Sequence, residues 1–176
     1  MKIAKFLSIV LLLTVFTGCK EDKTVPEEIG DNVVSTFFFI RHAEKDRSNP
    51  DNVDPELNQD GLGRAMKWAE VLDNVPLDAI YSTDFERTTM TAAPAAVKKD
   101  ITVQYYDPDQ IDIEQFKAVN QGYNVLVVGH SHSTPEFVNK MIGIEKYNAL
   151  DDSDNASLFI VQIVGNQTTD LQIRVD

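Results

Sequence analysis

The chain has 176 residues, of which 43% are hydrophobic and 25% charged, and its formal net charge at pH 7 is −12. This length and composition predict one globular domain with a buried core. An acidic chain lacks the basic surface that neutralises nucleic-acid phosphates, so we expect no nucleic-acid partner. An anionic ligand would require positive charge that is concentrated at one place.

The N-terminal residues predict an export signal. Lys2 and Lys5 precede an apolar run at 6–16, and Thr17-Gly18-Cys19 follows it. The run is shorter than a transmembrane helix, which needs about 20 apolar residues, and it is typical of a signal peptide. Its end resembles a bacterial lipobox, in which Cys19 becomes the lipidated first residue, although Phe16 replaces the more usual leucine. An ordinary secretory signal with cleavage nearby is the alternative.

Three segments are therefore expected: a lipoprotein signal peptide at 1–18, a flexible tether at 19–32, and a folded domain at 33–176. The tether is charged and has no hydrophobic period. A lipid on Cys19 would anchor the protein to a membrane of the bacterial cell envelope. We expect an outer-membrane lipoprotein that is periplasmic or surface-exposed. Lys20-Glu21-Asp22 resembles a surface-export signal, but it suits a solvated tether equally well.

Apolar runs and helical patterns alternate along the rest of the chain. Strands are expected at 37–40, 77–81, 101–106, 125–128, 157–164 and 168–175, and helices after Asn58, at 85–97, at 111–119 and after Gly129. The first and fourth strands should be buried on both faces, because their residues are continuously apolar. Repeated strand–helix units that end in a hairpin predict a three-layer α/β/α sandwich with a mainly parallel, mixed sheet.

Local residue choices predict where the helices begin. Asn58 is a good N-cap for the first helix, and Ser82-Thr83-Asp84 should cap the second. Thr134 should cap the last helix, with Pro135 in its first turn. Trp68 should lie outside the apolar face of the first helix. That face should comprise Leu62, Ala65, Met66, Ala69 and Leu72.

Charged residues and histidines follow three of the predicted strands. Arg41 and His42 follow the first, Asp84 and Arg87 the second, and His130 and His132 the fourth. The carboxyl ends of parallel strands share one edge of a sheet, so these groups should converge. Guanidinium groups match phosphate oxygens, and a histidine can attack phosphorus. The pattern predicts a site for a tetrahedral oxyanion.

Three sequence blocks carry a resemblance to a known family. They are Arg41-His42-Ala43-Glu44, YSTDFERTTMTA at 81–92, and Val127-Val128-Gly129-His130-Ser131, and residues 54–65 form a further similar segment between the first two blocks. In this order and spacing they resemble the signature of the histidine phosphatase superfamily, also called phosphoglycerate mutase-like. The resemblance spans about residues 36–142, and Ala43 replaces the glycine that more often follows the histidine.

The resemblance implies a role for each matching residue. His42 would be the nucleophile and carry the phosphoryl group as a phosphohistidine. Arg41 and Arg87 would hold the phosphate oxygens, and His130 would donate a hydrogen bond to them. Water would then hydrolyse the intermediate. His132 would either touch the substrate at the rim or be an ordinary loop residue.

The general acid is open at this stage, because several carboxyl groups follow the strands. Asp107 is preferred, since its loop resembles the acid-bearing segment of larger relatives, and Asp109, Glu136 and Glu44 are the other candidates. Glu44 has a second interpretation, an ion pair with Lys45 or Arg47.

The predicted activity is a phosphatase that hydrolyses small phosphorylated substrates without a cofactor. No metal is expected, because the paired histidines lack supporting ligands at the usual spacing. The alternatives are mutase-type phosphoryl transfer and a non-catalytic module that binds phosphate or a phosphoglycan. Only 42 residues separate Arg87 from His130, which leaves little chain for the lid that a mutase needs.

Overall fold

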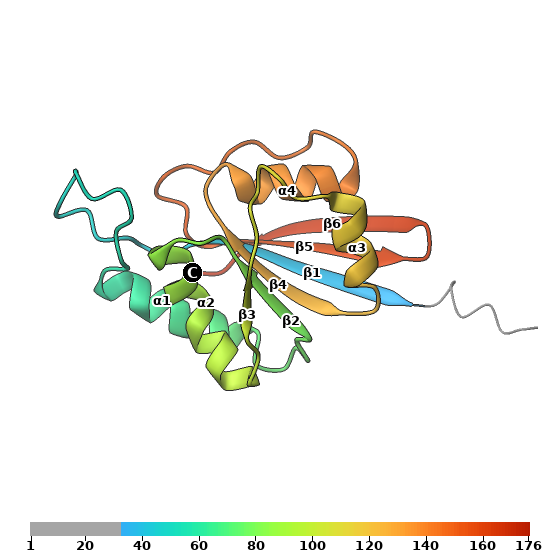
Figure 1. Ribbon diagram of the computed structural model, residues 1–176, viewed down its shortest axis with the longest axis horizontal. Coiled ribbons are helices and arrows are strands. Elements are labelled where there is room, and N and C mark those ends of the chain that lie inside the picture. Colours follow the sequence, from blue (N-terminus) through green and yellow to red (C-terminus); the bar gives the residue numbers. More distant parts are fainter. Residues whose placement is uncertain (1–32) are drawn as a thin grey trace, which may run out of the picture.

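The computed structural model describes residues 33–176, which form a six-stranded sheet covered by helices (Figure 1). The elements are β1 (Val34–Arg41), α1 (Gln59–Val71), β2 (Ala79–Ser82), α2 (Glu86–Lys99), β3 (Val103–Tyr105), α3 (Ile113–Val119), β4 (Asn124–Gly129), α4 (Ser133–Ile142), β5 (Ser157–Val164) and β6 (Gln167–Arg174). Helices α1 and α2 cover one face and α3 and α4 the other, so the predicted three-layer class is confirmed. The signal peptide, Cys19 and the tether lie outside the described residues.

The sheet has the strand order β3-β2-β4-β1-β5-β6. Strands β1, β2, β3 and β4 pair in parallel, whereas β5 pairs antiparallel with both β1 and β6. The mainly parallel sheet with a terminal hairpin therefore agrees with the prediction. The parallel strands bring their carboxyl ends to one edge, where ligands bind in open α/β sheets.

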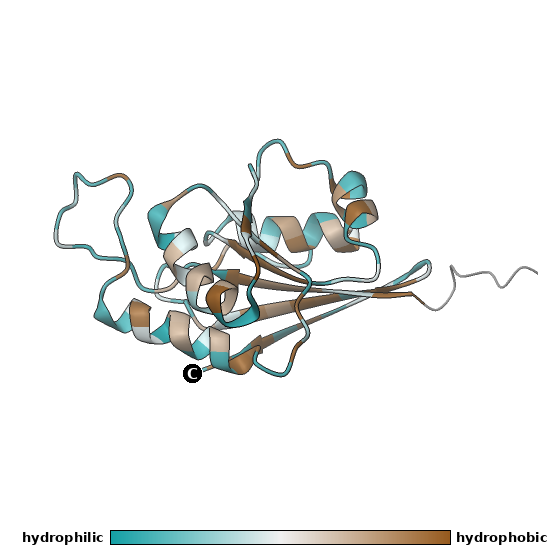
Figure 2. Cartoon of the chain, turned by 60° about the horizontal axis from the view of Figure 1, so that its bottom comes forward, coloured by the Kyte–Doolittle hydropathy of each residue, from teal (hydrophilic) through white to brown (hydrophobic). Residues whose placement is uncertain are grey.

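Strand β1 lies inside the sheet and is buried on both faces, as its apolar run predicts. Phe37 and Phe39 pack in the core on the α3 and α4 face, whereas Phe38 and Ile40 belong to the core under α1 and α2. The brown apolar strands run between helices in Figure 2. Because neighbours hold β1 on both edges and both faces, the residue at its end is held firmly in place.

Helix α1 begins where the sequence predicts, but it buries a different face. The Asn58 side chain accepts a hydrogen bond from the Gly61 backbone N–H at 2.9 Å, which confirms the predicted cap. Trp68 is only 1% exposed, while Leu62 is 40% and Met66 56% exposed. The expected face was therefore right for Ala65, Ala69 and Leu72, but wrong for Leu62 and Met66, because the helix turns Trp68 toward the core that it shares with α2. The buried set is Gly61, Ala65, Trp68, Ala69 and Leu72.

The starts of α2 and α4 also differ from the predictions. Phe85 precedes α2, and its side chain makes no capping hydrogen bond. The Asp54 carboxylate instead accepts hydrogen bonds from the Glu86 backbone N–H. The cap thus comes from a distant loop and not from Asp84. Helix α4 already begins at Ser133, whose hydroxyl accepts from the His130 backbone N–H, so Thr134 lies inside the helix. None of the helices within residues 33–176 is long and apolar enough to cross a bilayer.

Candidate active site

The carboxyl ends of β1, β2 and β4 surround a cavity of about 360 Å³. Arg41 pairs with Gly129 in the sheet, and the His42 backbone N–H continues this pairing by donating to the Gly129 carbonyl at 2.9 Å. The predicted site residues converge here. The lining comprises Arg41, His42, Lys45, Phe85, Arg87, Asp107, Pro108, Asp109, His130, Ser131, His132 and Asp152.

The His42 ring is held in one tautomer. Its Nδ1 lies 2.7 Å from the Ala43 carbonyl oxygen, which can only accept a hydrogen bond. Nδ1 therefore carries the proton, and the lone pair is on Nε2. Burial, with help from nearby positive charge, lowers the pKa of His42 to about 3. At neutral pH the imidazole is uncharged, which is the form that a nucleophile requires.

The backbone around His42 is held by side chains from two distant segments. Asn155 donates through Nδ2 to the His42 carbonyl at 2.7 Å. The Ala43 N–H donates to the Thr91 hydroxyl at 2.9 Å, and this hydroxyl donates to the Arg87 carbonyl at 2.6 Å. Helix α2 and the loop before β5 therefore fix His42 through its backbone.

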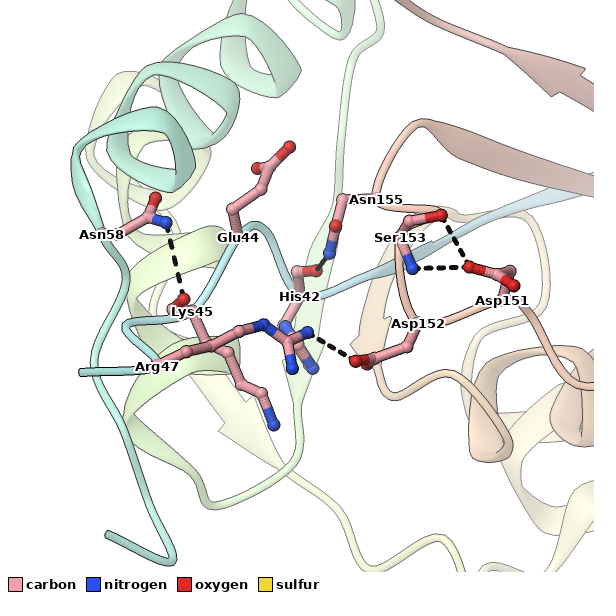
Figure 3. A pocket seen from close by; sticks show the side chains of 9 residues that line it. All are labelled: His42, Glu44, Lys45, Arg47, Asn58, Asp151, Asp152, Ser153 and Asn155. Carbon is pink, nitrogen blue, oxygen red and sulfur yellow. Dashed lines mark hydrogen bonds and ion pairs between the residues drawn. The ribbon is translucent and has the colours of Figure 1, made fainter. Parts of the chain in front are cut away.

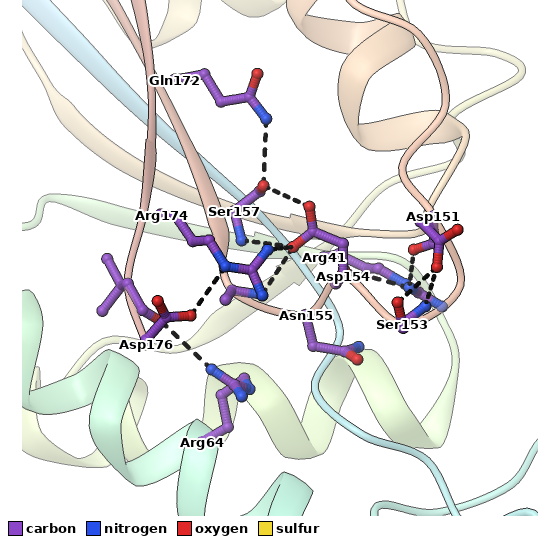
Figure 4. Close-up of polar contacts among 12 residues, drawn as sticks. Arg41, Arg64, Asp151, Ser153, Asp154, Asn155, Ser157, Gln172, Arg174 and Asp176 are labelled. Atoms are coloured by element: carbon purple, nitrogen blue, oxygen red, sulfur yellow. Dashed lines mark hydrogen bonds and ion pairs between the residues drawn. The ribbon is translucent and has the colours of Figure 1, made fainter.

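Arg41 is only 2% exposed and binds the loop before β5. Its Nη1 donates to the carbonyl oxygens of Asp151, at 2.9 Å, and Asp154, at 3.2 Å, and Nη2 contacts the Asp152 carboxylate at 2.7 Å. The loop is itself held by Asp154, which accepts from Ser157 and from Arg174 of β6 (Figure 4). The buried Nε of Arg41 has no hydrogen-bond partner among residues 33–176.

Arg87 projects from the first turn of α2 into the same cavity. Its Nη1 contacts the Asp54 carboxylate at 3.0 Å, and its guanidinium lies 4.4 Å from the centre of the Phe85 ring. Asp54 is fixed in turn by the backbone N–H of Glu86, which donates hydrogen bonds to both carboxylate oxygens at 3.1 Å. The buried Nε of Arg87 also has no partner. Two guanidinium groups therefore line one cavity.

His130 completes the cavity and is held by a chain of hydroxyl groups. Its Nε2 lies 2.9 Å from the Thr83 hydroxyl, which lies 3.0 Å from the Thr88 hydroxyl. Arg87 Nη2 lies 3.5 Å from Nδ1, so Nδ1 accepts and Nε2 carries the proton in this arrangement. Burial and the charge of Arg87 lower the pKa of His130 to about 4. In the other neutral tautomer, Nε2 accepts a hydrogen bond from the Thr83 hydroxyl and Nδ1 carries the proton, and that tautomer of His130 has a donor for a phosphate oxygen.

The residues at the rim are less constrained. His132 is exposed, and its ring stacks on His130 with 6.2 Å between the ring centres. Asp107 and Asp109 line the cavity from the loop after β3. The Asp107 carboxylate accepts from the Asp109 N–H at 2.9 Å and from Gln110 at 2.6 Å. Of the carboxyl groups considered as acids, these two lie at the cavity.

The other two acid candidates have different partners. Glu136 is exposed on α4, forms an ion pair with Lys140 at 2.7 Å, and does not line the cavity. Glu44 contacts Arg64 of α1 at 2.6 Å, so the expected pairing with Lys45 or Arg47 was wrong. The reason is that the start of α1 packs against the backbone of Glu44 and brings Arg64 within reach.

A second cavity of about 560 Å³ adjoins the first (Figure 3). His42, Lys45 and Asp152 line both cavities. In Figure 3 the Arg47 side chain extends across toward Asp152, whose carboxylate it contacts at 2.6 Å. Asp152 thus bridges the buried Arg41 and the half-exposed Arg47 at the boundary of the two cavities.

The sequence did not predict several supporting residues, among them Asp54, Thr83, Asn155 and Asp152. Thr83 was expected only in a helix cap, although its position directly after β2 signals proximity to the site. The other three lie in loops without a periodic pattern. No group of three or more His, Cys, Asp or Glu side chains within residues 33–176 is arranged to hold a metal ion.

Comparisons with known proteins agree with this geometry. Residues 37–108 match the family model described as histidine phosphatase superfamily (branch 1). No curated protein gives a match. Three solved structures are similar in fold: the protein histidine phosphatase SixA complexed with tungstate, a mycobacterial glucosyl-3-phosphoglycerate phosphatase, and a phosphoglycerate mutase from Bacillus anthracis.

The structural similarity covers most of each chain at low sequence identity. SixA shares 15% identity with a TM-score of 0.63, and the match covers 79% of this chain and 96% of SixA. The mycobacterial phosphatase shares 15% with a TM-score of 0.59, over 81% and 98% of the two chains. The mutase shares 16% with a TM-score of 0.62, over 82% and 94%. At such identities the likeness establishes the fold. Residues 37–108, which carry Arg41, His42 and Arg87, are the part of the chain that matches the histidine phosphatase superfamily (branch 1).

Proposed function

We propose that this protein is a phosphatase that hydrolyses phosphomonoesters through a phosphohistidine on His42, without a metal ion. The observation that carries the proposal is the state of His42. Its Nδ1–H is bound to the Ala43 carbonyl, so a neutral Nε2 lone pair is available. Arg41 and Arg87 each have a buried, unpartnered Nε donor at the same cavity.

In the first half of the reaction, the Nε2 lone pair of His42 attacks phosphorus. The bond between phosphorus and the ester oxygen breaks, and its electron pair remains on the leaving oxygen. Arg41 and Arg87 neutralise the charge on the nonbridging oxygens, which is the main protein contribution to phosphoryl transfer. The Ala43 carbonyl stabilises the positive charge that develops on the imidazole, because it accepts from Nδ1.

The leaving oxygen takes a proton from a carboxylic acid, for which we propose Asp107. Its exposed position on the cavity rim suits contact with the alcohol part of a substrate. In the second half, water attacks the phosphohistidine and gives one proton to the Asp107 carboxylate. The bond between phosphorus and Nε2 breaks, its electrons return to Nε2, and inorganic phosphate leaves. Protonated Asp107 is then ready for the next cycle.

The deciding experiment compares the wild type, His42→Asn and His132→Asn in two measurements. The first is the rate of hydrolysis of para-nitrophenyl phosphate. The second is the amount of labelled phosphate that remains bound to the protein after the reaction is quenched with acid. We expect His42→Asn to abolish turnover and labelling, because the variant lacks the nucleophile. His132→Asn should retain both. Turnover that survives His42→Asn would contradict the phosphohistidine. Turnover that disappears in EDTA and returns with a divalent metal would contradict the metal-free mechanism.

Measurements on the same protein also test two alternative functions. A mutase would transfer the trapped phosphoryl group to an added alcohol instead of to water. Hydrolysis is favoured because α2, β3 and α3 fill most of the chain between Arg87 and His130. A binding module would bind phosphate without turning over any ester on a broad panel. Measurements of released phosphate separate these outcomes.

The cellular location remains a prediction from residues 1–19. We propose that Cys19 is lipidated and that the domain lies in the cell envelope. Replacement of Cys19 by serine should release the protein from the membrane fraction. Retention of the variant in that fraction would contradict a lipid anchor.

A further inference from the structure

Arg41 and Arg87 each have a carboxylate partner, but the two carboxylates are held very differently. Asp54, the partner of Arg87, also accepts from the Glu86 N–H at the start of α2, and it does not line the phosphate cavity. Within residues 33–176 the partners of the Asp152 carboxylate are two arginine side chains, Arg41 at 2.7 Å and Arg47 at 2.6 Å. Asp54 is therefore fixed by a backbone N–H as well as by its arginine, whereas Asp152 is held by arginine side chains alone.

Asp152 is not needed to orient Arg41. The carbonyl oxygens of Asp151 and Asp154 already hold Nη1, at 2.9 and 3.2 Å. The Arg41 side chain is 2% exposed, whereas that of Asp152 is 65% exposed. An exposed carboxylate that rests on a buried, otherwise fixed guanidinium can leave without disturbing it.

The carboxylate also uses a donor that a phosphate would need. A guanidinium binds phosphate best through two parallel N–H groups. Nη1 of Arg41 is taken by carbonyl oxygens and the unpartnered Nε is buried, so Nη2 is the donor for which a ligand would have to compete. Asp152 contacts this Nη2 and lines the cavity of about 360 Å³ in which we propose that phosphate binds.

We propose that Asp152 is an exchangeable internal anion that competes with phosphate for Arg41. An incoming phosphoryl group takes the Nη2 donor, and the displaced carboxylate remains paired with Arg47. When the product has formed, Asp152 returns to Arg41 and lowers the affinity of the site for inorganic phosphate. The identification of the competing ligand as phosphate rests on the proposed function of the site.

The test is calorimetric titration of the full-length protein with inorganic phosphate, compared between the wild type and Asp152→Asn. The amide keeps the shape of the side chain and removes its charge. We expect phosphate to bind about tenfold more tightly to the variant, since a hydrogen bond between charged groups accounts for about this factor. Glu136→Gln makes the same change in net charge on exposed α4 and should bind phosphate as the wild type does.

Each other outcome contradicts the proposal. Unchanged affinity in Asp152→Asn would mean that the carboxylate does not compete. Weaker binding would mean that Asp152 positions Arg41, and urea unfolding of the same variant would show whether the loop had lost stability. The titration involves no turnover, so it remains decisive if His42 is not the nucleophile. Failure of the proposed function would appear instead as hydrolysis that does not depend on His42.

Discussion

Acidification should destabilise the folded protein through His42. Burial keeps the pKa of this imidazole at about 3 in the folded state, whereas a histidine in an unfolded chain titrates near pH 6.5. Between these values the unfolded chain binds a proton that the folded protein excludes. Stability therefore rises with pH in this window and is lost as the pH falls from about 6.5 toward 3.

The size of the effect follows from the unfolded chain. Between pH 7 and pH 4.5, protonation of His42 in the unfolded state should lower the free energy of unfolding by about 2.5 kcal/mol. This value hardly changes for any folded-state pKa below about 4, because the folded imidazole is then almost uncharged at pH 4.5. His130, with a pKa of about 4, adds a loss of the same sign and similar size.

Urea unfolding at pH 7 and pH 4.5 measures this loss. Trp68 is the single tryptophan and is 1% exposed, so its fluorescence reports the packing of α1. The loss of stability on acidification should be about 2.5 kcal/mol smaller in His42→Asn than in the wild type. His132→Asn removes an exposed imidazole and is the matched control. Equal losses in the wild type and His42→Asn would refute the reasoning, and with it the neutral nucleophile.

Three further substitutions test the supporting structure. A Cβ at position 61 would lie 2.1 Å from a backbone oxygen, so Gly61→Ala should lower the free energy of unfolding in urea by more than about 2 kcal/mol. A Cβ at position 63 would meet nothing within 4 Å, so Gly63→Ala should raise the free energy of unfolding by up to about 1 kcal/mol. Asp54→Asn should lower kcat/KM about tenfold, because Arg87 loses a charged partner; an unchanged value would contradict the positioning role. Asp107→Asn should slow alkyl phosphates far more than para-nitrophenyl phosphate, whose leaving group needs no proton; equal slowing would exclude Asp107 as the acid.

The groups that face the cavity were predictable because they follow strands directly. Arg41, His42 and His130 follow apolar runs, and the geometry of a parallel sheet places the residues at the carboxyl ends of its strands along one edge. The side of α1 that faces the core was not predictable in the same way. Leu62 and Met66 fit a helical stripe as well as Trp68 does, and only the position of α2 decides which side is buried.

The supporting contacts were hidden for a different reason. Asn155 and Asp152 lie in a loop that has no periodicity, and they meet Arg41 and His42 across more than 100 residues of chain. Asp54 lies within the segment that carries the family resemblance, but its contact with Arg87 depends on how the loop folds back over α2. Pairings between distant segments follow from the tertiary structure and leave no local sequence signal.

The contacts of residues 151–155 with Arg41 and His42 have a consequence for the order in which the site is assembled. The first strand emerges early in synthesis, but the contacts that fix Arg41 and the His42 carbonyl come from the last part of the chain. Contacts between such distant segments form late, because closing a long loop costs entropy. A chain still being synthesised therefore holds His42 without the contacts that orient it. If His42 is the nucleophile that we propose, we expect activity to appear only after the C-terminal hairpin has joined β1.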